Sequence, residues 1–342
     1  MTSTLIAPST RRASTHATGR RILTGDRPTG RLHLGHYFGT LANRVRLQHE
    51  GYELFVVIAD YQVITDRDTP GSVAERSLEL VLDYLACGID PADSLVFTHS
   101  SVPALHQLML PFLSLVSTAE LTRNPTIKEE IRLAGREAVS GLMLTYPVNQ
   151  AADILFCKAN LVPVGKDQLP HIELTRNIAR RFNERYGEVF PLPEGLLGET
   201  PVLAGLDGRK MSKSLNNSIA LTDSADVVRD KVTSAKTDSE RQITFEPDRR
   251  PEVANLLTLA GLCGGRSPVE LAAEIGTGGG AGLKSVVIDS VVEFLRPLAA
   301  RRSQFDLADA ATILARGGGE ARQIADETLS EVTRAMGMNP MF

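Results

Sequence analysis

The sequence predicts an α/β fold, a doubly wound parallel sheet with a smaller all-helical domain at its carboxyl end. Short apolar runs, which are the expected strands, alternate with amphipathic segments up to about residue 217. This alternation indicates parallel strands with helices on both faces of the sheet. Beyond residue 217 the strand pattern fades while helical patterns continue. In such a sheet the ligand binds at the carboxyl ends of the strands.

The chain is expected to have three parts. Residues 1–20 are rich in Ser, Thr and Arg and contain no acid, as in many targeting segments. Pro8 and the lack of an amphipathic stripe favour a disordered tail instead. Residues 21–217 are expected to form the sheet domain and residues 218–342 the helical domain.

Each element is predicted from its periodicity: strands are short continuous apolar runs, and helices repeat apolar residues every three or four positions. The predicted strands are 22–24, 54–59, 95–98 and 161–164, with 242–245 as a candidate for one more. The predicted helices are 34–48, 73–87, 103–116, 146–157 and 286–298. The apolar stripes expected to be buried are Phe38, Leu41, Val45 and Leu47 in the first helix, and Val287, Val291, Phe294 and Leu298 in the last.

Two segments depart from these patterns. The helix predicted at 103–116 is apolar on nearly every side, so it should be buried either in the core or against another subunit. The segment 278–285 nearly matches a phosphate-binding GxxxxGK[ST] loop, but Leu283 stands at the second glycine position and no strand precedes it. We therefore expect a loop between helices there.

Composition excludes several classes of protein. A net charge of −4 means that any contact with RNA must use a local basic patch. The cysteines Cys87, Cys157 and Cys263 are far apart and form no CxxC pair. This spacing argues for free thiols in a reducing, cytoplasmic location and against a zinc or iron–sulfur site. No apolar run approaches the length of a membrane span.

The string His33-Leu34-Gly35-His36 predicts an anion site. It follows a predicted strand and the turn Gly25–Gly30, and it begins a predicted helix. Free backbone N–H groups and the positive end of the helix dipole should both face this turn. By itself, the string also fits a capped helix with two surface histidines.

A second string, Lys210-Met211-Ser212-Lys213-Ser214, lies in a glycine-containing polar loop. Lysines on such a loop can close over a polyphosphate and neutralise its charge as the leaving group departs. The alternative is a solvated basic loop, which the presence of the histidine string makes less favoured.

Together these strings resemble the HIGH and KMSKS signatures of class I aminoacyl-tRNA synthetases, and the residues around them resemble tryptophanyl-tRNA synthetases in particular. The similarity extends from about Arg21 to Met338, in the order of the family. Blocks that carry it include TGDRPTGRLHLGHYFGTL from residue 24, IADYQVITD from 58, RNPTIKEE from 123, YPVNQAADIL from 146 and VPVGKDQLPHIELTRNIARRFN from 162.

The resemblance implies a Rossmann-like catalytic domain, a helical domain that binds the tRNA anticodon, and a homodimer paired through about residues 103–136. The implied activity joins L-tryptophan to ATP as an adenylate, releases pyrophosphate, and passes the tryptophanyl group to tRNA(Trp). ATP would carry Mg²⁺, with no metal held by the protein itself, and no membrane is involved. The implied cations for RNA are Lys231, Lys236, Arg241, Arg249 and Arg250, each of which also fits plain solvated surface.

The resemblance also assigns site residues. The implied catalytic residues are His33, His36, Lys128, Lys210 and Lys213. The implied ATP-binding residues are Arg27, Pro28, Thr29, Gly35, His36, Gly165, Lys166, Asp167, Val202, Leu203, Lys210, Met211, Ser212, Lys213 and Ser214. The implied tryptophan-binding residues are Gly25, Arg27, Gln62, Gln150, Asp153, Val162, Val164 and Gln168.

Asp153 is the residue implied to select tryptophan, since the matching aspartate of the family accepts the indole N–H. Its place in a predicted helix, between Ala152 and Ile154, is unusual for a carboxylate with no function. Two residues depart from the common bacterial pattern: Arg27 replaces a glutamine, and Gln150 replaces a methionine that packs on the indole. Both changes could alter sensitivity to inhibitors that mimic tryptophan.

Three other functions remain as alternatives. A tyrosyl-tRNA synthetase shares the architecture but usually has a further RNA-binding module. A cofactor-forming nucleotidyltransferase shares the HxGH string but lacks the lysine loop and the helical domain. An inactive RNA-binding paralogue would be expected to lose histidines or lysines of the two strings, and none is lost.

Overall fold

The computed structural model describes residues 20–66, 72–134, 140–197, 203–209, 211 and 215–338. It contains a five-stranded parallel sheet in the order β3-β2-β1-β4-β5. The strands are β1 (Arg21–Asp26), β2 (Glu53–Ile58), β3 (Ser94–Thr98), β4 (Leu161–Val164) and β5 (Glu194–Leu197). The order of strands reverses between β1 and β4, and this switch point is where an open α/β sheet binds its ligand.

The predicted α/β fold is confirmed, and so are the four strands predicted in the sheet domain. Strand β5 was not predicted, because Glu194 and Gly195 break the continuous apolar run by which the other strands were recognised. The candidate strand at 242–245 is wrong, since that segment is irregular backbone.

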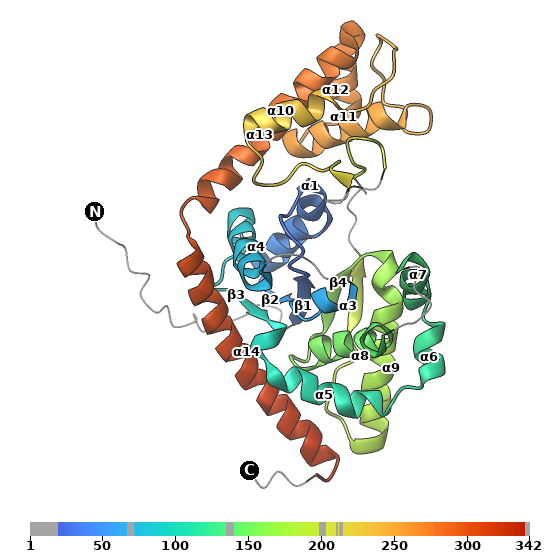
Figure 1. The fold of residues 1–342 in the computed structure, drawn as a ribbon, viewed down its shortest axis with the longest axis vertical. Helices are drawn as coiled ribbons and strands as arrows, with labels where there is room; N and C mark the ends of the chain where they lie inside the picture. Colours follow the sequence, from blue (N-terminus) through green and yellow to red (C-terminus); the bar gives the residue numbers. More distant parts are fainter. Residues whose placement is uncertain are drawn as a thin grey trace, which may run out of the picture.

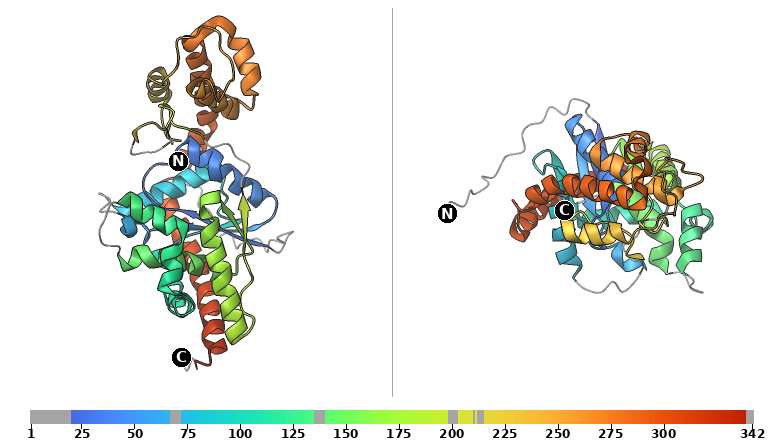
Figure 2. Two further views of the ribbon diagram at one scale, coloured as in Figure 1. Left: turned by 90° about the vertical axis from the view of Figure 1, so that its right-hand side faces the viewer. Right: turned by 90° about the horizontal axis from the view of Figure 1, so that it is seen from above.

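Helices cover both faces of the sheet (Figure 1, Figure 2). Those of the sheet domain are α1 (Leu34–His36), the π-helical turn Tyr37–Leu41, α2 (Ala42–His49), α3 (Val63–Asp66), α4 (Val73–Cys87), α5 (Pro103–Leu113), α6 (Thr118–Arg123), α7 (Pro125–Ala134), α8 (Gly141–Leu155) and α9 (Leu169–Tyr186). Short 3₁₀ turns follow β3 and β4, at His99–Ser101 and Lys166–Gln168.

Alternating side chains of the strands build two cores. Ile22, Leu54 and Val56 pack in one core, which continues into the helical domain. Leu23 and Phe55 pack in the other, among the side chains of α5, α8 and α9. Strands β1 to β3 therefore bury both faces, as expected for a parallel sheet with helices on either side, whereas the edge strand β5 is largely exposed.

The predicted helices are present, with three corrections. The helix at 34–48 contains a π-helical turn, and Phe38 and Val45 are only partly buried. The helix predicted at 103–116 ends at Leu113 and is not buried on every side, because Leu110 is 74% exposed. The segment 278–285 is no loop: a 3₁₀ turn (Gly276–Gly278) leads directly into helix α13.

The helical domain lies at one end of the molecule (Figure 1). Its helices are α10 (Ala225–Thr233), α11 (Pro251–Gly264), α12 (Pro268–Ile275) and α13 (Gly279–Arg302). The predicted stripe of α13 is buried at Val287, Val291 and Leu298. Phe294 of α13 packs on Tyr37, with 4.9 Å between the ring centres, and so joins this domain to the π-helical turn that follows α1.

Helix α14 (Leu307–Ala335) leaves the helical domain and runs beside the sheet domain, against β3 and α5 (Figure 1, Figure 2). Gly317 permits this packing, because a Cβ at that position would lie 1.9 Å from the carbonyl oxygen of Val96. The predicted helical domain at 218–342 stays a prediction, and we propose that its carboxyl-terminal helix belongs to the catalytic domain.

Among the described helices, none combines the length and the apolar character needed to cross a membrane.

Candidate active site

A cleft of about 750 Å³ opens at the carboxyl ends of β1 and β4, at the switch point of the sheet. It is lined by residues from both strands, from the turn after β1 and from α8. The predicted site residues in its lining are Gly25, Arg27, Thr29, His33, Gly35, His36, Gln62, Gln150, Asp153, Val162, Val164, Gly165, Gln168, Leu203 and Met211.

Other predicted residues are not in this lining. Pro28 is buried, and its carbonyl oxygen accepts a hydrogen bond from Nε of Arg76 at 2.9 Å. Lys128, Lys166 and Asp167 are exposed nearby, where Thr126 of α7 donates to the carbonyl oxygen of Asp167 at 3.0 Å. The predicted residues that lie outside the described part of the chain are Val202, Lys210, Ser212, Lys213 and Ser214.

The two signature strings meet at this cleft. Gly35 lies against Met211, since a Cβ on the glycine would be 3.0 Å from the methionine sulfur. The chain that follows the second string then pairs with the first: Leu34 N–H donates to the Ile219 carbonyl at 3.0 Å, and Leu221 N–H to that of Leu32 at 2.9 Å. Segments far apart in sequence therefore form one wall of one cavity.

The two histidine rings of the first string pack against each other at a tilt of 47°. Their ring centres are 3.7 Å apart, and the backbone N–H of His33 donates to Nδ1 of His36 at 3.2 Å. Since Nδ1 of His36 accepts this bond, the proton of a neutral ring lies on Nε2. His33 is extended and precedes α1, so both rings lie at the start of a helix, where anions are stabilised.

An ion pair below the turn was not predicted. Arg44 of α2 is fully buried and binds Asp26, the last residue of β1, at 2.5 Å, and it also donates to the Gly25 carbonyl at 3.1 Å. Burial raises the pKa of Asp26, but Arg44 and the Tyr84 hydroxyl outweigh it and hold that pKa below its usual value. Arg44 is three residues from both Leu41 and Leu47, so its place on the buried face of the helix was a usable signal.

The opposite end of the cleft is apolar and contains a buried carboxylate. Asp153 lies on α8 between Ala152 and Ile154, both fully buried. Ser140 caps this helix, since its hydroxyl accepts a hydrogen bond from the Met143 N–H at 3.1 Å. The predicted position of Asp153, on a helix and facing the cleft, is found in the structure.

Two buried histidines lie behind this end, and neither was predicted. Nε2 of His99 is 3.0 Å from Oδ2 of Asp153, and Nε2 of His171 is 3.0 Å from the Tyr146 hydroxyl. Burial lowers the pKa of His171 to about 4, with a small opposing effect of Asp167. Burial also disfavours charge on His99, but Asp153 outweighs it and raises the pKa of His99 above its usual value.

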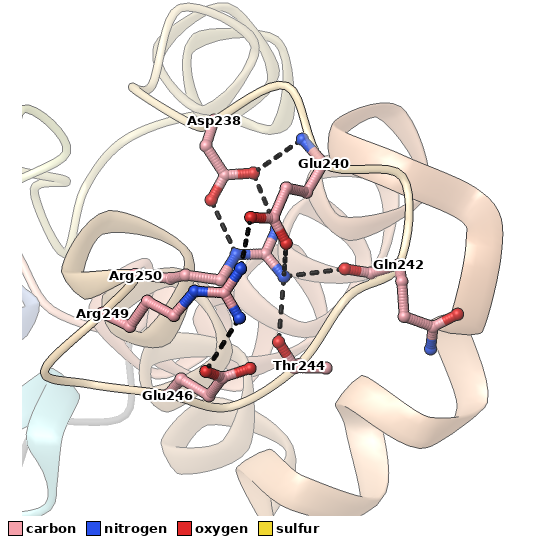
Figure 3. A network of polar contacts seen from close by, with 7 residues as sticks. All are labelled: Asp238, Glu240, Gln242, Thr244, Glu246, Arg249 and Arg250. Atoms are coloured by element: carbon pink, nitrogen blue, oxygen red, sulfur yellow. Dashed lines mark hydrogen bonds and ion pairs between the residues drawn. The ribbon is translucent and has the colours of Figure 1, made fainter.

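The basic residues of the helical domain are largely engaged within the chain. Arg250 is 3% exposed and binds Asp238 at 2.7 Å, as well as the Gln242 carbonyl and Thr244 (Figure 3). Its predicted role as an exposed RNA contact is therefore wrong. Arg249 pairs with Glu240 and Glu246 in the same network. Among the other cations predicted to contact RNA, Lys231 pairs with Asp223 and Lys236 pairs with Glu252.

Comparison with known proteins agrees with this architecture. A family model described as "tRNA synthetases class I (W and Y)" matches residues 17–296. The tryptophan–tRNA ligase of Treponema pallidum is 42% identical over 328 residues, which cover 93% of this chain and 97% of the relative. That of Streptococcus pyogenes is 44% identical over 334 residues, with coverages of 93% and 98%.

Solved structures give the same result. The tryptophanyl-tRNA synthetase of Campylobacter jejuni, in complex with ADP and tryptophan, has a TM-score of 0.81 and 30% identity, and covers 93% of this chain and 99% of its own. The enzyme of Mycoplasma pneumoniae has a TM-score of 0.79 and 29% identity, with coverages of 94% and 98%. With its fold, its two converging strings and relatives of this coverage, the chain belongs to the class I aminoacyl-tRNA synthetases, and within them to the tryptophanyl-tRNA synthetases.

Proposed function

We propose that this chain is a tryptophan–tRNA ligase. A carboxylate oxygen of L-tryptophan attacks the α-phosphorus of ATP, pyrophosphate leaves, and the tryptophanyl group then passes to the 3′-terminal ribose of tRNA(Trp) with release of AMP. The observation that carries this proposal is the single cleft shared by the histidine string, Met211 of the lysine string and the buried carboxylate of Asp153.

At the phosphate end, the turn after β1 and the start of α1 offer N–H groups and two imidazoles to a triphosphate. We assign His33 and His36 to the phosphates, and Arg27 and Thr29 to the same turn. Lys210 and Lys213 would neutralise the pyrophosphate as it leaves, because phosphoryl-type transfer depends mainly on positioning and charge. Mg²⁺ would bind through ATP oxygens and water. No side chain has to act as nucleophile.

At the amino-acid end, Val162 and Val164 offer apolar walls to an indole, and Asp153 offers an acceptor for its N–H. A buried acceptor left unpaired costs about 1–3 kcal/mol, so phenylalanine would be penalised as well as bound less well. Gln62, Gln150 and Gln168 supply amide groups around the same space.

The partners of the chain are also proposals. Leu110 of α5 is 74% exposed, which supports a homodimer paired through residues 103–136. The helical domain of α10–α13 would bind the tRNA anticodon.

Amino-acid-dependent ATP–pyrophosphate exchange tests the function. We expect exchange with tryptophan and little with tyrosine or phenylalanine, followed by charging of tRNA(Trp). Exchange that prefers tyrosine would favour the tyrosyl enzyme, exchange without any amino acid would favour a nucleotidyltransferase, and no exchange at all would favour an inactive paralogue.

A further inference from the structure

Behind the proposed tryptophan pocket lies an ion pair that the sequence did not suggest. His99 follows the end of β3 in a 3₁₀ turn and is fully buried, and Asp153 on α8 is almost as deeply buried. Nε2 of His99 lies 3.0 Å from Oδ2 of Asp153. Two elements distant in sequence thus meet through one charged contact behind the cleft.

The two oxygens of the Asp153 carboxylate have different surroundings. Oδ2 of Asp153 lies within ion-pair distance of Nε2 of His99, although that nitrogen makes no hydrogen bond among the described residues. Oδ1 is buried and also has no hydrogen-bond partner among them. Because Asp153 lines the cleft, a hydrogen-bond donor on a ligand bound there can satisfy Oδ1.

Titratable groups face His99 from three segments. Asp153 approaches from α8, Asp60 acts from the turn after β2, and His106 of α5 lies with its ring centre 6.4 Å away. Asp60 is itself held by Ser100, whose backbone N–H donates to it at 3.1 Å. Two carboxylates therefore act on one imidazole, and they outweigh its burial in raising its pKa.

We propose that His99 is a positioning residue for amino-acid selection: its ion pair with Oδ2 holds the Asp153 carboxylate in place, with Oδ1 presented to the indole N–H. This inference rests on the proposed function. In this inference His99, which does not contact the ligand, supports the part of tryptophan selection that depends on the indole N–H.

Two ligands that differ at the indole N–H measure this contribution to selectivity. Tryptophan and β-(3-benzothienyl)alanine have nearly the same shape, but the second carries sulfur in place of the indole N–H. Binding of both is measured by calorimetry on the full-length chain and on His99→Leu and His99→Gln variants. His106→Gln serves as the control, because His106 contacts the His99 ring without contacting Asp153 in the described structure.

The wild type should prefer tryptophan over the analogue by on the order of tenfold, and His99→Leu should lose that preference. His99→Gln retains an N–H donor and should keep a reduced preference. His106→Gln should behave as the wild type.

A loss of affinity for both ligands by the same factor in His99→Leu, with the preference intact, would overturn the inference. So would a preference in His99→Gln equal to that of the wild type, a comparison that remains available even if His99→Leu does not fold. A wild type that binds tryptophan no better than tyrosine would instead overturn the proposed function itself.

Discussion

The two ends of the cleft are built in different ways. At the proposed amino-acid end, the proposed recognition group Asp153 is buried on a helix and forms an ion pair with His99. At the proposed phosphate end, the two histidines lie on one short turn, whereas the cations Lys210 and Lys213 come from a separate segment of the sequence. We therefore expect that changes at the amino-acid end alter mainly the affinity for tryptophan. Changes at the phosphate end should alter mainly the rate of adenylate formation.

The largest expected effect is at the phosphate end. Lys213→Ala should slow adenylate formation by on the order of 100-fold or more and leave tryptophan affinity unchanged, because its charge matters most as pyrophosphate leaves. Single-turnover kinetics measure the rate, and the indole fluorescence of the ligand measures affinity, since the chain contains no tryptophan. Lys236→Ala, which removes a cation paired with Glu252, is the control. A large loss of tryptophan affinity in Lys213→Ala would contradict the division of roles.

The amino-acid end should respond in the opposite way. Asp153→Ala removes the acceptor for the indole N–H and should raise the tryptophan dissociation constant by roughly 10- to 100-fold. The KM for ATP should change little. Fluorescence titration and exchange kinetics at varied ATP give the two values. If ATP affinity fell as much as tryptophan affinity, the two ends would not bind their ligands independently.

A pH measurement extends the comparison to the histidine behind this end. His171 has a folded pKa of about 4, below the usual value of about 6.5, so the unfolded chain binds the extra proton between these values. Stability from this residue is present above pH 6.5 and is lost as the pH falls toward 4, with a loss of about 2 kcal/mol at pH 5. Urea unfolding of wild type and His171→Gln at pH 7 and pH 5 checks this. Equal losses in both proteins would exclude His171 as the cause.

The smallest expected effect lies away from both ends. Arg250→Met removes the hydrogen bonds to Asp238, Gln242 and Thr244 and should lower the free energy of unfolding by about 1–2 kcal/mol (Figure 3). Tryptophan affinity and the rate of adenylate formation should stay as in the wild type. A change in either would show that this network reaches the cleft. The exposed Arg241, replaced by Met, is the matched control.

Local pattern predicted much of this molecule. Strands β1 to β4 are continuous apolar runs, and the helix that carries Asp153 places it at the cleft. The convergence of the two strings was implied by the resemblance to the family, and the switch-point rule placed the ligand at the carboxyl ends of the strands. For the lysines of the second string the prediction stays open, because they lie outside the described residues.

What the sequence did not predict depends on contacts between distant segments. In the sequence His99 is a polar residue after a strand, with no sign of its partner. Its contact with Asp153 appears only when the fold brings α8 beside the turn that follows β3. The packing of α14 on β3 depends on Gly317, which in a helical pattern shows only a local weakness. Arg250 looked like a surface cation, and its burial follows from an irregular loop with no period to interpret.

Trapping of the adenylate tests the central claim most directly. The full-length chain is mixed with α-labelled ATP and one amino acid, and the labelled adenylate bound to protein is counted. At a short fixed time and a tryptophan concentration near the wild-type dissociation constant, the account predicts abundant tryptophanyl-adenylate on the wild type. It predicts a sharp reduction in Asp153→Ala, which binds tryptophan weakly, and in Lys213→Ala, which reacts slowly. Equal adenylate with tyrosine, or full adenylate in both variants, would contradict a cleft in which these two ends act on one reaction.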